Sequence, residues 1–349
     1  MNTNKVSSEC IEQRVNSGLL NYWYPVLQSW SVTGIPTGIT RLGQRIVLWR
    51  DQQGVLHALE DRCPHRGARL SKGWNLGDKL ACWYHGVQIS SEGNVVDVPA
   101  ESNCNMIGDA SIKSYKVYEH SDTIFLWFGD ELNGQPADID LPEFLVDKEN
   151  YSSFLCMAKW NCNYRYAVEN VMDPMHGAYL HADSHSMAEG DKTAEMRVRN
   201  TDQGYVFEKV GQLGVNFDWC ELIDTGVMAL TLAIPYGAGA GPGGNFKIVG
   251  ITTPVDEHNC LVFFWRIRES KGWQRNLWRF MYRTKLEKLH WGVLEQDRIL
   301  LEAMSDDARE NEYLYSHDVG LSRLRKILAK KAKQQLQTVA DATLIIRSR

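Results

Sequence analysis

Two short motifs decide the fold of this chain of 349 residues: CPHRG at residues 63–67 and CWYHG at residues 82–86. Each motif places one cysteine and one histidine after a β-like segment, so two loops close on a single metal site. Structural zinc sites of the C-x-x-C type place both thiolates in one loop, whereas a Rieske [2Fe-2S] centre takes two thiolates on one iron and two imidazoles on the other. The spacing therefore predicts a Rieske cluster, with structural zinc as the alternative. The expected ligands are Cys63, His65, Cys82 and His85.

A second group of metal ligands is predicted in the segment ENVMDPMHGAYLH, residues 169–181. On an ideal helix the side chains of His176 and His181 would point about 140° apart. Both histidines reach one metal only if the helix bends or ends between them. Pro174 disfavours helix at Asp173 and suits the first turn of a new helix, so we expect Asp173 at a helix break or cap.

The third ligand of this site is expected in the helical segment EKLHWGVLEQDRILLEAM, residues 287–304. Asp297 falls within an apolar stripe, where a charge is costly unless it is paired or bound to a metal. Two histidines and one carboxylate with open coordination positions form the facial triad of non-haem Fe(II) oxygenases. His290, on the same face, is expected as a hydrogen-bonded core residue rather than a ligand, while Asp183 and His185 compete with the named ligands. The stripe consists of Leu286, Leu289, Val293, Asp297, Leu300 and Met304.

Short β-like segments separated by turn signals run from about Tyr22 to Gly129 and predict a small antiparallel β domain. After a linker at residues 131–144, helical patterns around 161–181 and 273–309 enclose strand-like runs. This texture predicts an α+β domain with helices packed on an antiparallel sheet. A basic amphipathic helix follows, and we expect its leucine and isoleucine side to pack on the protein itself. The expected domains are residues 20–131, 145–315 and a helical tail at 316–349.

The composition and charge narrow the classes of function. A formal net charge of -5 argues against non-specific nucleic-acid binding and against binding to an anionic membrane surface. No stretch approaches the roughly 18 apolar residues of a membrane span, and the first residues do not form a signal peptide, so we expect a cytoplasmic protein. The eight cysteines are spread over a long chain, which favours reduced thiols over a disulfide framework.

Together these residues resemble the Rieske non-haem iron oxygenases, the α-subunits of ring-hydroxylating oxygenases. The resemblance covers about residues 22–309, and the length is closer to the vanillate and dicamba O-demethylases and phthalate dioxygenase than to longer α-subunits. It implies a Rieske [2Fe-2S] domain, a helix-grip catalytic domain, and a head-to-tail homotrimer in which the cluster of one chain serves the mononuclear iron of the next. It also implies that Asp173 bridges His176 to the His85 of a neighbouring chain and that Asn170 lies near the iron.

The function that this resemblance implies is that of a terminal oxygenase component. A flavin and iron–sulfur reductase, with or without a ferredoxin, would deliver electrons from NAD(P)H, and O2 would be used to dihydroxylate or hydroxylate a small aromatic substrate. An O- or N-demethylating monooxygenase is the alternative within the family. Outside it, the alternatives are a Rieske electron carrier, a zinc-binding interaction protein, and an oxygenase-like scaffold without mononuclear iron. The two histidines and Asp297 weigh against all three.

Six residues on strand-like segments could line a substrate pocket, although their alternation is equally typical of core positions. They are Phe217, Trp219, Ile234, Phe246, Phe263 and Trp265. Arg165, Arg197 and Arg199 could pair with a carboxylate of the substrate, but surface ion pairs are the expected role for each. The glycine-rich stretch GAGAGPGG, residues 237–244, is expected as a surface loop, with a ligand lid as the alternative.

Overall fold

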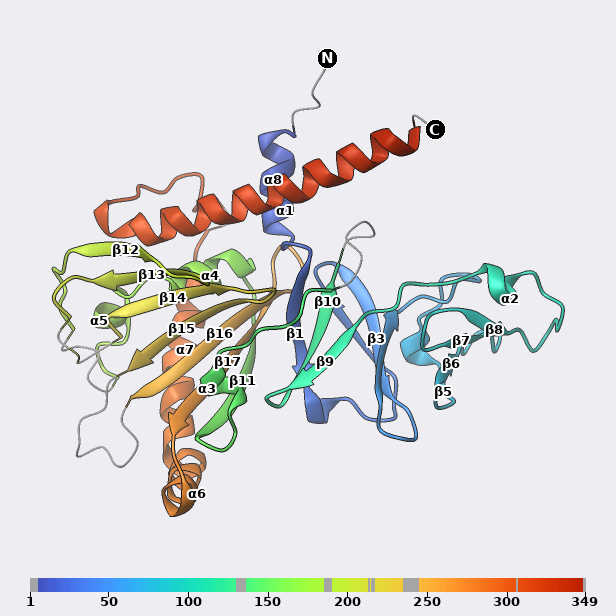
Figure 1. The fold of residues 1–349 in the computed structure, drawn as a ribbon, viewed down its shortest axis with the longest axis horizontal. Helices are drawn as coiled ribbons and strands as arrows, with labels where there is room; N and C mark the ends of the chain where they lie inside the picture. Colours follow the sequence, from blue (N-terminus) through green and yellow to red (C-terminus); the bar gives the residue numbers. More distant parts are fainter. Residues whose placement is uncertain are drawn as a thin grey trace.

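In the computed structural model, the two halves of the chain lie end to end (Figure 1). Within the described residues, the N-terminal half holds three small antiparallel sheets and the C-terminal half one large antiparallel sheet covered by helices. The α+β fold class predicted from the sequence is confirmed. Among the described helices, none combines the length and the apolarity needed to cross a bilayer. The structure describes residues 6–129, 136–184, 190–212, 214, 217–234, 245–305 and 307–347.

The N-terminal half is built from short strands in the sheet orders β1-β10-β9, β2-β3-β4 and β5-β6-β7-β8. β3 pairs with both β2 and β4, and its residues face two different cores in alternation. Val47 and Trp49 face the core around the cysteine loops, while Ile46 and Leu48 face the core shared with the C-terminal half. The strands are β1 (Tyr22–Gln28), β2 (Thr37–Arg41), β3 (Gln44–Arg50), β4 (Leu56–Glu60), β5 (Trp74–Asn75), β6 (Lys79–Ala81), β7 (Gln88–Ser90), β8 (Val95–Asp97), β9 (Val117–His120) and β10 (Thr123–Phe128).

The C-terminal half is organised by a seven-stranded antiparallel sheet in the order β11-β17-β16-β15-β14-β13-β12. β17 pairs along its whole length with β11, from Tyr151 opposite Glu269 to Trp160 opposite Cys260, and also pairs with β16 on its other side. The strand-like runs seen in the sequence form these central strands. The strands are β11 (Tyr151–Trp160), β12 (Met196–Asn200), β13 (Gly204–Lys209), β14 (Trp219–Asp224), β15 (Met228–Ile234), β16 (Phe246–Pro254) and β17 (Cys260–Glu269).

The helices agree only in part with the sequence-based expectation. The segment expected to be helical over 273–309 forms two helices joined by a π-turn at Tyr282–Leu286, a type of irregularity that is frequent at functional sites. The second of them ends at Glu302, before the expected end, and α1 was not predicted at all. The helices are α1 (Ser8–Asn16), α2 (Met106–Asp109), α3 (Glu143–Val146), α4 (Tyr164–Val171), α5 (Gly177–Leu180), α6 (Gly272–Met281), α7 (Glu287–Glu302) and α8 (Val319–Arg347).

Strand β17 separates two apolar cores, because successive side chains of a strand point to opposite faces. Phe264 packs in the core beneath the helices, whereas Phe263 and Trp265 pack on the other face with Trp23 of β1 and Trp127 of β10. The second group joins the two halves of the chain. Burying one such aromatic side chain stabilises the fold by about 1.5–3 kcal/mol, so this layer fixes the halves relative to one another.

The buried side of α7 differs from the stripe read from the sequence. Leu289, Leu300 and Met304 were expected to be buried with Asp297, but they are 47%, 44% and 41% exposed. The stripe expected from the sequence and the stripe buried in the structure overlap at Asp297 and differ by a rotation of one residue. The sequence pattern fits both stripes, and tertiary packing selects between them. Asp297 is buried in both arrangements. The residues that α7 buries are His290, Leu294, Asp297 and Leu301.

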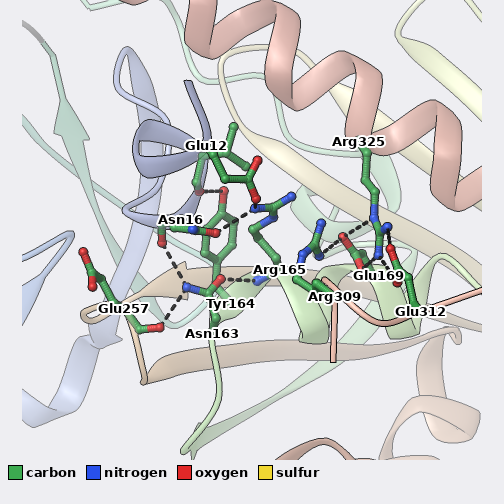
Figure 2. Close-up of polar contacts among 11 residues, drawn as sticks. Glu12, Asn16, Asn163, Tyr164, Arg165, Glu169, Glu257, Arg309, Glu312 and Arg325 are labelled. Atoms are coloured by element: carbon green, nitrogen blue, oxygen red, sulfur yellow. Dashed lines mark hydrogen bonds and ion pairs between the residues drawn. The ribbon is translucent and has the colours of Figure 1, made fainter. Parts of the chain in front are cut away.

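Helix α4 is held from outside by the two ends of the chain, as Figure 2 shows. Glu169 of α4 accepts hydrogen bonds from Arg325 of α8, at 2.8 Å, and from Arg309. Arg165 of α4 pairs with Glu12 of α1. The apolar side of α8 is buried against the protein, as expected from its amphipathic sequence. The charges and the apolar side of α8 therefore both fasten it to the C-terminal half.

The contact between α8 and the sheet leaves no room for a side chain at Gly320. A Cβ atom there would lie 2.4 Å from the ring of Phe207, whereas a Cβ atom at Gly292 of α7 would meet nothing within 4 Å. We expect Gly320→Ala to destabilise the protein by about 1–3 kcal/mol through overpacking. The matched variant Gly292→Ala should stabilise it by about 0.5–1 kcal/mol. Thermal unfolding midpoints test this, and equal midpoints for the two variants would contradict the packing described.

Candidate metal centres

The two cysteine loops repeat the same turn. In each, the cysteine N–H donates to a carbonyl five residues later, and the N–H of the following glycine donates back to the cysteine carbonyl, with all four bonds at 2.8–2.9 Å. The glycines have φ values of +77° and +72°, in the left-handed region that side chains disfavour. Two equivalent turns therefore present two equivalent cysteines. The bonded sets are Cys63 with Ala68 and Gly67, and Cys82 with Val87 and Gly86.

The four predicted ligands of the loops lie together, with sulfur donors inside and nitrogen donors outside. Cys63 and Cys82 are each 1% exposed, whereas His65 and His85 are exposed and their ring centroids are 4.8 Å apart. Burial raises the pKa of the Cys63 thiol to about 11, although the backbone N–H groups of His65 and Arg66 bond to its sulfur. Two buried thiols and two exposed imidazoles match the division of ligands between the irons of a Rieske cluster.

The break in helix between His176 and His181, which the sequence required, is present. α5 has only four residues, with His176 as its N-cap and His181 as its C-cap, so the two side chains leave from opposite ends of a short helix. A Cβ atom at Gly177 would lie 2.5 Å from the ring of Phe217, so glycine allows α5 to approach this ring. The Nε2 atoms of both histidines point toward Asp297 of α7.

His176, His181 and Asp297 form one group whose potential ligand atoms all lie within 4.8 Å of one another. The Nε2 atoms of His181 and His176 are 3.2 and 3.6 Å from Oδ1 of Asp297. His181 is 1% and Asp297 6% exposed, so the group lies inside the C-terminal half. Two imidazoles and one carboxylate fit the donor set of a mononuclear non-haem iron site.

The Nδ1 atom of each histidine has an acceptor that turns Nε2 toward the centre of the group. Nδ1 of His176 donates to the backbone carbonyl of Asp173 at 2.6 Å, and Nδ1 of His181 donates to Oε1 of Gln296 at 2.9 Å. Such contacts fix the tautomer and orientation of metal-binding histidines. The sequence analysis missed Gln296, whose only signal is its position beside Asp297 on α7.

Asn170 and the local charges complete the site. Nδ2 of Asn170 donates to Oδ1 of Asp297 at 3.1 Å, so Asn170 lies next to the group, as the resemblance implied. Burial lowers the pKa of His176, although Asp297 opposes the shift. Burial also acts against protonation of His181, but the hydrogen bond and charge of Asp297 raise the pKa of that histidine. The charge of Asp297 thus opposes the effect of burial on the pKa of both imidazoles, and it outweighs burial only at His181.

Asp173 occupies the break between α4 and α5, as expected. Its Oδ1 atom accepts a hydrogen bond from the N–H of Met175 at 2.8 Å, which forms a local turn. Within one chain it is therefore the carbonyl of Asp173 that contacts His176, while the half-buried carboxylate caps the turn.

An apolar pocket adjoins the three ligands, and its empty space is about 610 Å³ when the open mouth is included. Phe217, Ile234 and Phe246 line it, as was considered from the sequence. Trp219, Phe263 and Trp265 do not, because Phe263 and Trp265 point to the opposite face of the sheet, while Trp219, at the start of β14, lies outside the pocket wall. The remaining lining residues are Asn170, Val171, His176, His181, Leu232, Ile248, Phe264, Arg266, His290, Val293, Leu294 and Asp297.

The other charged candidates lie elsewhere. Arg197 and Arg199 pair with Glu208 at the surface, as expected. Arg165 also forms an ion pair away from the pocket, but its own side chain is buried while that of its partner Glu12 is exposed. Arg266, which the sequence analysis did not consider, lies in the pocket wall instead. His290 is a buried pocket residue whose ring centroid is 4.7 Å from that of Phe246, and Asp183 is exposed. His185 and the stretch 237–244 lie outside the described residues.

Comparison with known proteins identifies a family for each half of the chain. Residues 22–116 match the family model of the Rieske [2Fe-2S] domain, and residues 160–334 match that of the vanillate O-demethylase oxygenase C-terminal domain. The vanillate O-demethylase oxygenase subunit of a Pseudomonas species is 34% identical over 172 residues, which are 49% of this chain and 48% of that protein. The chain thus aligns with about half the length of this relative. The iron–sulfur subunit of the toluene-4-sulfonate monooxygenase system of Comamonas testosteroni is 28% identical over 81% of this chain and 87% of that protein.

Solved structures share the fold. The terminal oxygenase of carbazole 1,9a-dioxygenase from Novosphingobium sp. KA1 superimposes with a TM-score of 0.74 at 20% identity, covering 94% of this chain and 98% of that one. The two family matches give the class of the protein, that of oxygenases with an iron–sulfur domain. More particularly, the chain belongs to the Rieske oxygenases whose catalytic part is the vanillate O-demethylase oxygenase C-terminal domain.

Gln296 should be a determinant of iron affinity. We expect Gln296→Met to lower the affinity of the mononuclear site for Fe(II) by about 10–100-fold, because the ring of His181 loses its Nδ1 acceptor. Fe(II) titration measures this, and the reduced-state EPR signal of the cluster should not change. The control is Glu295→Gln, at the neighbouring exposed position, which should bind iron as the unmodified protein does. An unchanged affinity in Gln296→Met would contradict the orienting contact.

Proposed function

We propose that this chain is the terminal oxygenase component of a multicomponent Rieske oxygenase. It receives electrons from NAD(P)H through a flavin and iron–sulfur reductase, with or without a ferredoxin, and uses O2 to hydroxylate or dihydroxylate a small aromatic substrate. The observation that supports this most directly is the group of His176, His181 and Asp297 at the end of an apolar pocket. A solved complex of an oxygenase and a ferredoxin in carbazole 1,9a-dioxygenase, with a TM-score of 0.73, supports the fold of such a component.

Each metal-binding role is assigned by donor chemistry. When bound, the Rieske cluster transfers single electrons and the mononuclear iron activates O2. Cys63, His65, Cys82 and His85 would hold the cluster, and His176, His181 and Asp297 would hold the iron. Asn170 positions the carboxylate of Asp297, and the apolar walls of the pocket keep water away while orienting the substrate beside the ligands.

The electron route crosses between chains in this proposal. In Figure 1 the strands β5–β8, which adjoin the cysteine loops, and helix α5 lie toward opposite ends of the molecule. The cluster of one chain therefore serves the iron site of another, in a homotrimer of the kind that the family resemblance implies. Asp173 has a half-buried carboxylate three residues before His176, and the exposed ring of His85 is open to a neighbouring chain. We infer that Asp173 links these two histidines across the interface.

The domain boundaries that we propose are residues 20–131, 145–315 and 316–349. The two halves described above support the first two, and the separate ionic and apolar contacts of α8 support the third. We also propose a cytoplasmic location, because the eight cysteines are free, which is typical of reducing compartments.

O- or N-demethylation is the second candidate reaction, and the names of relatives favour it. Besides the vanillate enzyme, the oxygenase component of dicamba O-demethylase from Stenotrophomonas maltophilia is 34% identical over 46% of this chain. Demethylation begins with hydroxylation of a methyl carbon, so both candidates use the same metal ligands and differ in which substrate atom the pocket places beside them. The electron-carrier and zinc-module alternatives leave the buried triad without a role.

Metal analysis separates these classes. We expect anaerobically purified protein to hold about three irons and two acid-labile sulfides per chain, with a Rieske EPR signal after reduction, and to consume O2 with a reductase and substrate. Two irons with the same signal would be resolved by adding Fe(II): recovery of O2 uptake supports the oxygenase, and no recovery supports the carrier. Zinc without sulfide would overturn the proposal.

Asp173 tests the route between chains. We expect Asp173→Ala and Asp173→Asn to keep both metal centres but to slow electron transfer in single-turnover experiments by about 100-fold. The asparagine variant retains an oxygen for the N–H of Met175, so it separates loss of the carboxylate from loss of the turn. Asp183→Asn, at an exposed position of the same segment, is the control and should be unaffected. A normal single-turnover rate in both Asp173 variants would remove the bridging role.

A further inference from the structure

Arg266 is a buried cation in the wall of the pocket, and the proposed function has not yet used it. It lies on β17 between Trp265 and Ile267, and it is 3% exposed. Arginine stays protonated in proteins, and its planar guanidinium presents five N–H donors and no acceptor. A buried charge of this kind requires partners, because transfer of an unpaired ion from water into an apolar interior is costly.

The partners that surround Arg266 are neutral. Nη2 donates to the backbone carbonyl of His290 at 3.1 Å, and Nη1 contacts the sulfur of Cys156. Burial raises the pKa of Cys156 even though Arg266 acts in the opposite direction, so this sulfur is a thiol. The hydroxyl of Tyr282 lies 3.8 Å from the same sulfur. Throughout the part of the chain that the structure describes, no carboxylate lies within 4.0 Å of the Arg266 guanidinium.

Two other buried arginines show how this fold otherwise satisfies such a charge. Arg165 pairs with Glu12, a carboxylate. Arg41 has no acid but makes three N–H bonds to the carbonyls of Val26 and Thr40. The partners of Arg266 are one carbonyl, one thiol and the hydroxyl of Tyr282, and unlike Arg41 or Arg165 it faces the pocket that the iron ligands also line. Its remaining donors are therefore placed to meet something that enters the pocket.

We propose that Arg266 binds the carboxylate or sulfonate group of an aromatic substrate, so that this pocket selects aromatic acids. The inference rests on the proposed function, whose substrate class it narrows. An acid group accepts two parallel N–H bonds from a guanidinium, which a neutral amide or alcohol does not. Inside an apolar pocket this difference is large, because the neutral ligand leaves the buried donors unpaired.

The position of Arg266 also orients the ring. Its contact is the carbonyl of His290, and the Cα atoms of His290 and Asp297 are two turns apart on α7, about 10 Å along the helix axis. The anion site and the iron ligands therefore lie toward different ends of one pocket, with Phe246 and Phe264 among the residues that line it. An aromatic ring held by its acid group at Arg266 would direct its far substituent toward the iron ligands.

The acidic residues of β17 and α7 are Glu269, Glu287, Glu295, Asp297 and Glu302. Glu287, half-buried in the first turn of α7, contributes to the electrostatics of Cys156 but does not approach Arg266 within ion-pair distance. Glu287 does not neutralise the guanidinium by direct contact. The pocket walls otherwise add apolar groups, Asn170, the histidines and Asp297, whose carboxylate contacts His176 and His181 rather than Arg266.

The test compares acids with their neutral isosteres. Isothermal titration of the complete, iron-loaded chain under anaerobic conditions uses two pairs of probes: benzoate with benzamide, and benzenesulfonate with benzenesulfonamide. We expect at least one acid to bind about tenfold or more tightly than its amide. Equal affinities within both pairs, or no binding of either acid up to about 10 mM, would overturn the proposal.

Variants assign the preference to the residue. Arg266→Gln should lose the preference for acids while binding the amides as before, and Arg266→Lys should retain part of it because the charge remains. Arg197→Gln, at an exposed ion pair outside the pocket, should keep the full preference. An acid preference that survives Arg266→Gln would reject Arg266 as its source. If Arg266→Gln does not fold, Arg266→Lys and the unmodified protein still decide, since the comparison of acid with amide needs no other variant.

These titrations measure binding without turnover, so their result tests the anion site separately from the proposed oxygenase activity. A strong preference for acids in a protein without O2 uptake would overturn the oxygenase proposal and keep the anion site. Normal reductase-dependent O2 uptake with equal affinities for acids and amides would overturn the anion site and keep the oxygenase proposal.

Discussion

One oxygen atom, Oδ1 of Asp297, holds the candidate iron site together. It accepts a hydrogen bond from Asn170 at 3.1 Å and lies 3.2 Å and 3.6 Å from the inward nitrogens of His181 and His176. A buried carboxylate persists only with such partners, because removing one partner of a buried charge pair costs about 3–5 kcal/mol. Since the partners come from α4 and from both ends of α5, the rotation of α7 and the path of residues 164–181 are fixed together.

The same constraint reaches the surface through α4. Glu169 faces outward to the arginines of α8 and of the preceding loop, while its neighbour Asn170 faces inward to the carboxylate. Arg165, one turn earlier, is tied to the helix at the beginning of the chain. Segments more than 100 residues apart thereby press on one short helix, and the position of a ligand partner depends on contacts that touch neither metal nor substrate.

The sequence was most informative where chemistry restricts residue type. Metal ligation admits few side chains at few spacings, so the two cysteine loops and the histidines were identified before the fold was known. Which face of α7 is buried was predicted wrongly, because overlapping apolar patterns leave a helix free to rotate by one residue. Gln296 was missed because its contact with His181 depends on how α5 and α7 pack, and its position beside Asp297 does not reveal that contact. Arg266 did have a signal, a single charge within the apolar run CLVFFWRI, which indicates a buried cation once the strand is known to be central.

Strand β17 brings these observations onto one backbone. Trp265 belongs to the layer that joins the two halves of the chain, and the next residue, Arg266, belongs to the pocket. Successive residues of this strand thus alternate between packing the two halves together and lining the pocket. Substitutions at the pocket-facing positions 264 and 266 can therefore change which substrate the pocket accepts during evolution. Positions 263 and 265 meanwhile preserve the packing between the two halves of the chain.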